Sequence, residues 1–143
     1  MRWEHTVEID APAETVWQLT TEVTGWPEFT PTMTSVERLD AGPLRVGSRA
    51  RIKQPGQSAA IWTVTSLDGD RRCFTWQTRR LGLIMAGSHL VQERGQGCRN
   101  TLGIELTGRG AGLFWLLFGR LMRRSIATEN AGFRTRAQAN LRG

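Results

Sequence analysis

Two histidines and one arginine are the side chains of this chain best suited to acid–base chemistry. An imidazole changes charge near neutral pH, so a histidine that faces a cavity can act as a general acid or base. His5 lies on the inward side of the first expected strand, whereas mixed faces around His89 leave its orientation open. Arg124 falls on the side of the last helix that we expect to face the sheet. An unpaired buried guanidinium is costly, so Arg124 either reaches a pocket mouth or pairs with an acidic group such as a ligand carboxylate.

His89 and Arg124 are therefore weak catalytic candidates, and the alternative for each histidine is a structural or surface role. Cys73 and Cys98 lie 25 positions apart without neighbouring cysteine or histidine, which predicts neither a zinc site nor a redox motif. No pair of carboxylates falls on an inward face, no glycine motif of a nucleotide site is present, and tyrosine is absent. We expect no metal ion and no cofactor.

The charge balance is basic. The formal net charge is +6, 18 of the 19 cations are arginine, and six arginines lie between residue 120 and the end. A basic segment can bind nucleic acid or anionic lipid. Neither a helix-turn-helix nor an aromatic RNA-binding motif accompanies these arginines, so we expect no nucleic-acid partner.

The length of 143 residues corresponds to one domain, residues 1–143, with enough chain to bury a core. The longest apolar run, 113–118, has six residues, far fewer than the ~20 of a membrane span. The first residues alternate in polarity without an apolar leader segment, which predicts a cytoplasmic protein.

The elements that must position these side chains follow from periodicity and turn residues. Residues 3–9 alternate as a strand, and Asp10 is the expected N-cap of a helix that ends near Gly25. A short helix or turn over 26–29 follows, and a long helix covers 113–140. Six further strands are expected between them, over 34–39, 48–54, 59–67, 72–78, 83–93 and 99–107. Short turns between consecutive strands predict antiparallel pairing.

This order predicts an α+β domain whose seven-stranded curved antiparallel sheet wraps around the long C-terminal helix. Each cleanly alternating strand has one apolar face, which a helix must cover. A single helix rarely fills the concave side of such a sheet, so we expect a cavity there.

Residues 7–31, VEIDAPAETVWQLTTEVTGWPEFTP, resemble the opening signature of the polyketide cyclase/dehydrase and lipid-transport superfamily, also called START-like or SRPBCC. The GPLRVGS turn over 42–48 and the aromatic pattern of strands 59–67 and 72–78 are similar as well. The resemblance covers essentially the whole chain. It implies the helix-grip fold, with two short helices after the first strand, and a function among cyclases, lipid carriers and hormone receptors.

Three functions stay open at this point. The first is binding of a small hydrophobic, lipid-like or polyketide-like molecule in an internal cavity, as a carrier or sensor. The second is a polyketide aromatase/cyclase-type enzyme in which His89 or Arg124 assists proton transfer. The third is a membrane-surface or partner-binding role of the last helix. The expected ligand-binding residues are Trp26, Phe29, Ile52, Trp62, Trp76, His89, Ile104, Leu117, Leu121 and Arg124.

The last helix carries two apolar stripes on opposite sides. The stripe containing Leu113, Leu117 and Leu121 is expected to face the sheet. The opposite stripe is Trp115, Met122, Ile126 and Phe133. We expect it to be covered by the first helix, by a second subunit in a homodimer, or by peripheral contact with a membrane.

Overall fold

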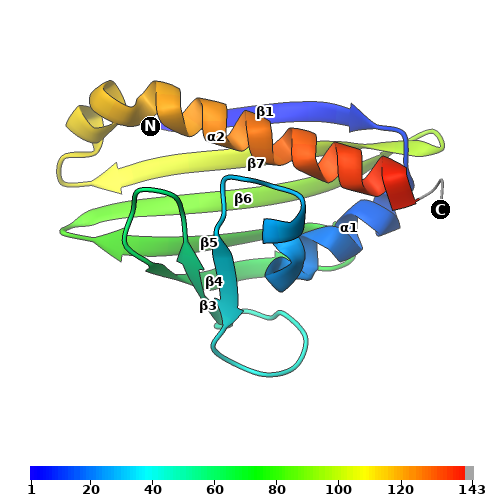
Figure 1. Ribbon diagram of the computed structural model, residues 1–143, viewed down its shortest axis with the longest axis horizontal. Helices are drawn as coiled ribbons and strands as arrows, with labels where there is room; N and C mark the ends of the chain where they lie inside the picture. Colours follow the sequence, from blue (N-terminus) through cyan, green and yellow to red (C-terminus); the bar gives the residue numbers. More distant parts are fainter. Residues whose placement is uncertain (141–143) are drawn as a thin grey trace.

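A computed structural model describes residues 1–140 of the chain as one curved sheet with helices on its concave side (Figure 1). The elements in chain order are β1 (Arg2–Ile9), α1 (Ala13–Thr21), the 3-10 helix η1 (Val23–Glu28), β2 (Ser35–Arg38), β3 (Arg49–Lys53), β4 (Ala60–Asp68), β5 (Cys73–Arg80), β6 (Leu83–Arg94), β7 (Gly97–Gly108) and α2 (Ala111–Asn140). All seven strands pair antiparallel, in the order β1-β7-β6-β5-β4-β3-β2. The α+β prediction and the two short helices after the first strand are confirmed.

The helix α1 differs from the prediction at both ends. It ends at Thr21 rather than near Gly25, because η1 begins at Val23. Pro12, not Asp10, occupies the N-cap position, and no side chain of the described residues caps the helix. The extended backbone of Pro12 (ψ 145°) is one that proline favours. The backbone N–H of Asp10 instead donates a 3.0 Å hydrogen bond to Gln138 Oε1, which ties the end of β1 to α2.

The long helix α2 runs along the sheet over β1 and β7 (Figure 1). Its buried side is formed by Met122, Ile126, Phe133 and Ala137, which recur at helical spacing. Burial of the larger of these side chains contributes about 2 kcal/mol each to stability. The same side faces β1, β7 and the aromatic residues that follow α1. Within residues 1–140, no helix is long and apolar enough to cross a membrane.

The two apolar stripes of α2 are thus oriented opposite to our expectation. The stripe of Met122, Ile126 and Phe133 is covered by the sheet of its own chain, while Leu113 and Leu117 of the other stripe are exposed. Neither a second subunit nor lipid is needed to cover the first stripe. The leucine stripe cannot face the sheet because beyond Leu121 its positions carry polar or small residues, so it could not pack along the whole helix.

A buried amide cluster fixes α2 on the sheet. Asn130 accepts a 2.8 Å hydrogen bond from Asn100 Nδ2 and donates to the backbone oxygens of His5 (3.0 Å) and Asn100 (3.1 Å). Asn100 and Asn130 are fully buried, so these bonds have little competition from water. The cluster joins α2 to β1 and β7 and sets the register of the helix.

Candidate functional site

The concave face of the sheet is the candidate site, because the aromatic side chains of several strands and His89 gather there. The strand registers place Ile52, Trp62 and Trp76 on this face, together with Leu102, Ile104 and Leu106 of β7. This confirms the predicted inward sides of β3, β5 and β7, the three strands whose residues alternate clearly in polarity. All of these side chains are buried except that of Trp62, which is half-buried.

Part of the concave face is accessible to solvent. Trp62 on β4, Thr78 on β5 and Met85 on β6 point inward, yet each keeps contact with solvent. Thr78 and Met85 are direct partners in the ladder, so these two partly exposed side chains are neighbours on β5 and β6. The concave face is therefore open beside these strands, while α2 packs on β1 and β7.

Aromatic rings form the closed part of the site. The Trp26 ring lies 5.4 Å from that of Trp76 and 5.8 Å from that of Phe133, between centroids. Trp76 continues the chain of contacts to Trp62 at 5.8 Å, and Phe29 packs on Phe133 at 5.0 Å. Trp26 is fully buried and its indole N–H donates to the Leu19 carbonyl at 3.0 Å, so its role is to support the site rather than to border open space.

His89 lies among these rings on β6. It stacks on Phe74 with centroids 4.8 Å apart and the planes 7° from parallel, and it lies 5.0 Å from Trp26. Burial lowers the pKa of His89 to about 3, so the imidazole is neutral at physiological pH. Its Nδ1 is buried and has no hydrogen-bond partner among the described residues. A neutral imidazole can exchange hydrogen bonds with a ligand but is a poor general acid.

Glu129 is a buried titratable residue that sequence reasoning missed, on the same side of α2 as Phe133, whose ring lies 5.9 Å from that of His89. It lies on the buried side of α2, three residues after Ile126 and four before Phe133, and its exposure is 8%. Burial raises the pKa of its carboxyl from 4.5 to about 7. The spacing from Ile126 and Phe133 would have revealed Glu129, had that stripe been assigned to the sheet.

Three predicted site residues lie outside the site. Leu117, Leu121 and Arg124 are exposed on the outward side of α2, so the prediction that they face the sheet was wrong. His5 is inward but belongs to the amide cluster, since its Nδ1 lies 3.1 Å from Asn130 Nδ2. Of the two catalytic candidates, His89 is at the concave face and Arg124 is not.

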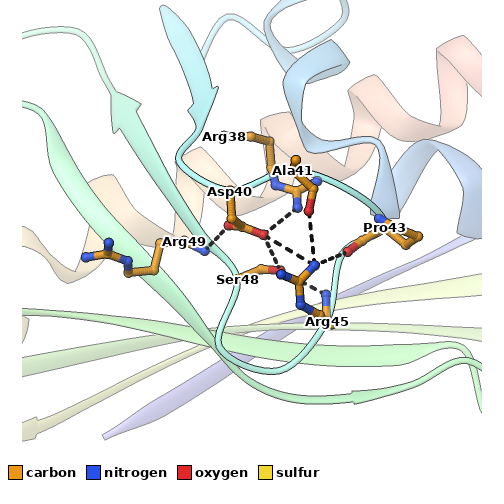
Figure 2. Close-up of polar contacts among 7 residues, drawn as sticks. All are labelled: Arg38, Asp40, Ala41, Pro43, Arg45, Ser48 and Arg49. Carbon is orange, nitrogen blue, oxygen red and sulfur yellow. Dashed lines mark hydrogen bonds and ion pairs between the residues drawn. The ribbon is translucent and has the colours of Figure 1, made fainter.

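The loop between β2 and β3 is held by Asp40, as Figure 2 shows. Asp40 accepts hydrogen bonds from the backbone N–H of Arg49 (2.8 Å), from the Arg38 guanidinium (2.9 Å) and from the Ser48 hydroxyl (3.0 Å). The Arg49 N–H and the Arg38 guanidinium are the main causes that lower the pKa of Asp40 to about 2. This fixed loop borders a groove of about 410 Å³ between the loop and the helices α1 and η1. The groove reaches the concave side of the sheet, because its lining includes Arg38 and Leu67, which pair with inward Ala50 and Phe74.

A family model described as polyketide cyclase / dehydrase and lipid transport matches residues 1–138. Among solved structures, the Zhui aromatase/cyclase from Streptomyces sp. R1128 is similar, with a TM-score of 0.81 and 21% identity over 99% of this chain and 95% of that one. A protein from Thermus thermophilus is similar with a TM-score of 0.79 and 18% identity, over 98% of this chain and 99% of that one.

Norcoclaurine synthase from Thalictrum flavum, in complex with a transition-state analogue, is similar with a TM-score of 0.78 and 16% identity, over 98% and 95% of the two chains. No curated protein sequence matches the chain. At these identities the solved structures show a shared fold, and they leave the chemistry to the residues of this chain.

Proposed function

The chain belongs to the polyketide cyclase / dehydrase and lipid transport family, and from this premise we propose that its concave face binds a small, largely apolar, ring-bearing molecule. The observation that carries the proposal is the half-buried set of inward side chains, Trp62, Thr78 and Met85, beside a wall of aromatic rings. Binding sites for small molecules are concave, mostly apolar and marked by a few polar groups.

The polar groups of the site favour a ligand with hydrogen-bonding atoms on an apolar frame. The unpartnered Nδ1 of His89 is a buried polar atom of the kind that native structures usually satisfy. The carboxyl of Glu129, half-protonated near neutral pH, can donate or accept a hydrogen bond. A carbonyl- or hydroxyl-bearing ligand fits both groups, whereas a strongly anionic one would be repelled by the charged form of Glu129. We propose that the protein acts as a carrier or sensor of such a molecule.

A matched pair of neighbouring residues tests this proposal. Trp62 points into the concave face, while the preceding residue Ile61 is exposed on the other side of β4. Fluorescence titration with the neutral probe 1-N-phenylnaphthylamine should show binding that Trp62→Ala weakens by about tenfold and Ile61→Ala leaves within about twofold. Equal effects of the two substitutions would contradict binding at the concave face.

A second function, enzymatic proton transfer, is favoured by Glu129 itself. A carboxylate with a pKa near 7 in an apolar site is suited to removing a proton from carbon next to a carbonyl. In this step the C–H bond breaks, its proton passes to Glu129, and its electron pair forms an enolate. Neutral His89 would then stabilise the enolate oxygen by donating a hydrogen bond.

Deuterium exchange into the methyl group of 2-acetylnaphthalene in deuterated water tests this second function. Mass spectrometry should show exchange that the protein accelerates, with a pH profile that rises through about pH 7 and is abolished by Glu129→Gln. Exchange no faster than in buffer leaves the carrier function as the better account, provided that the probe titration shows binding.

A further inference from the structure

The end of the molecule where α2 begins carries a cluster of exposed leucines that no described part of the chain covers. The helix contributes Leu113, Leu116, Leu117 and Leu121, with exposures of 63%, 80%, 64% and 57%. Leu81, in the turn between β5 and β6, is 97% exposed. Figure 1 shows this turn and the first turn of α2 at the same end of the molecule, and the Arg109 N–H donates to the Gly82 carbonyl at 3.2 Å. These five leucines are the leucine patch.

The conformation of Leu81 makes its exposure unusual. Leu81 and Gly82 form a two-residue turn with positive φ angles of 51° and 81°, a backbone that glycine, asparagine or aspartate normally provides. A leucine in this left-handed conformation costs stability, and here its side chain remains in solvent. Within the described residues, packing of the Leu81 side chain does not offset this cost, because the side chain is almost fully exposed.

Arginines surround the leucine patch and acids are absent from it. Segments 71–92 and 106–128 contain no aspartate or glutamate. Arg79 and Arg80 precede the tip leucine, and Arg120 and Arg124 lie beside the leucines on the outward side of α2; all four are exposed. The exposed part of this surface therefore carries positive charge only.

This charge distribution distinguishes between occupants of the patch. In a two-fold dimer the same surface would meet itself, so the arginines of one copy would face those of the other without a counter-charge. An anionic bilayer surface complements them, because leucines can enter the acyl boundary while arginines remain among the headgroups. Arg120 lies seven residues beyond Leu113, about 10 Å along the helix, which suits a helix that enters with its first turns.

We infer that the leucine patch docks the protein peripherally on an anionic lipid bilayer, with the tip of the β5–β6 turn and the first three turns of α2 in contact with the lipid. The open part of the concave face lies beside this contact. Thr78 and Met85 pair only two rungs of the ladder beyond Arg80 and Leu83, which flank the β5–β6 turn. A molecule that moves between bilayer and site would therefore travel only a short distance, past Leu83 and Met85 of β6 and Thr78 and Arg80 of β5.

Vesicle flotation tests the inference with one variant and one matched control. Leu116→Glu adds a negative charge to the patch at a side chain that is 80% exposed, so folding is preserved. Val46→Glu adds the same charge at an exposed valine of the β2–β3 loop, away from the patch. Binding of 1-N-phenylnaphthylamine by both variants provides an independent check of the fold and of the concave face.

The wild type should float with phosphatidylcholine vesicles that contain about 30% phosphatidylserine and bind phosphatidylcholine alone at least about tenfold more weakly. Raising the salt from about 0.1 M to about 0.5 M should release most of the protein. Leu116→Glu should lower the affinity for anionic vesicles by about tenfold, and Val46→Glu by no more than about twofold.

Absence of wild-type binding to the anionic vesicles, or equal losses in both variants, would overturn the inference. So would a wild-type dimer in sedimentation equilibrium that Leu116→Glu converts to a monomer, because a second copy would then cover the patch. Docking and probe binding are measured separately, so failure of either does not imply failure of the other.

Discussion

Replacing Glu129 by glutamine should change stability in a pH-dependent way. The free energy of unfolding of the variant, relative to that of wild type, should be more favourable at alkaline pH than in acid. Burial raises the pKa of Glu129 from 4.5 to about 7 in the folded state, so the unfolded chain releases this proton more readily than the folded protein. Unfolding is therefore favoured as the pH rises through this window. The contribution of Glu129 is most favourable below pH 4.5, falls between pH 4.5 and 7, and is constant above.

The size of this pH-dependent change in stability follows from the difference between the folded and unfolded pKa values of Glu129. A difference of about 2.5 in pKa corresponds to about 3 kcal/mol, since each pKa unit is worth about 1.4 kcal/mol. Glutamine keeps the shape of the side chain and cannot ionise. Any constant cost of the amide cancels when the stability difference between variant and wild type is compared at two pH values.

Urea denaturation at about pH 4.5 and about pH 8 measures this difference. The free energy of unfolding of Glu129→Gln relative to wild type should be about 3 kcal/mol more favourable at the higher pH than at the lower. For a slope of about 2 kcal/mol per molar urea, the relative midpoint moves by about 1.5 M. A relative stability that is independent of pH would refute the burial of Glu129 in an apolar site, and with it the acid–base role.

Three further substitutions test other parts of the structure. Asn130→Ala should lower the free energy of unfolding by about 3 kcal/mol in urea denaturation, because it leaves the buried amide of Asn100 without its partner; a loss below about 1 kcal/mol would contradict the amide cluster. His89→Phe should make the protein less sensitive to acid. The pKa of His89 is about 3 in the folded state and 6.5 in the unfolded state, so wild type should lose about 3 kcal/mol of stability relative to the variant as the pH falls from 6.5 to about 4.5. A stability difference between variant and wild type that is the same at about pH 7 and about pH 4.5 would show that His89 is not desolvated. Gly132→Ala should lower the melting temperature, because the added Cβ would collide with the Phe29 carbonyl. The control Gly112→Ala places a Cβ with no atom within 4 Å and should leave stability unchanged or slightly raised. Similar effects at both glycines would contradict the close packing of α2 on the residues that follow η1.

Most of the fold could be predicted because the strands alternate and their turns are marked by glycine, proline and aspartate. The inward side of β3, β5 and β7 followed from the same alternation. The orientation of His89 did not, since both sides of β6 are mixed in polarity. Its place is decided by pairing with Leu102 on β7 and Phe74 on β5, which is tertiary information.

The orientation of α2 was predicted wrongly for a physical reason. A helical wheel shows two apolar stripes but does not show how far each continues along the helix. The leucine stripe ends after three turns, and its later positions are taken by Arg124, Thr128 and Thr135. To pack on the sheet, a helix needs an apolar side that continues along its length. The stripe that contains Met122 and Phe133 provides this side. The error placed Leu117, Leu121 and Arg124 in the site and left out Glu129.

Native mass spectrometry of the protein purified from its source organism tests the central claim, binding at the concave face, most directly. We expect a small-molecule adduct on wild type and on Ile61→Ala, and its loss from Trp62→Ala, because Trp62 faces the site and Ile61 faces away. An adduct that persists undiminished on Trp62→Ala, or a wild-type protein that carries none and binds no apolar probe, would contradict the claim.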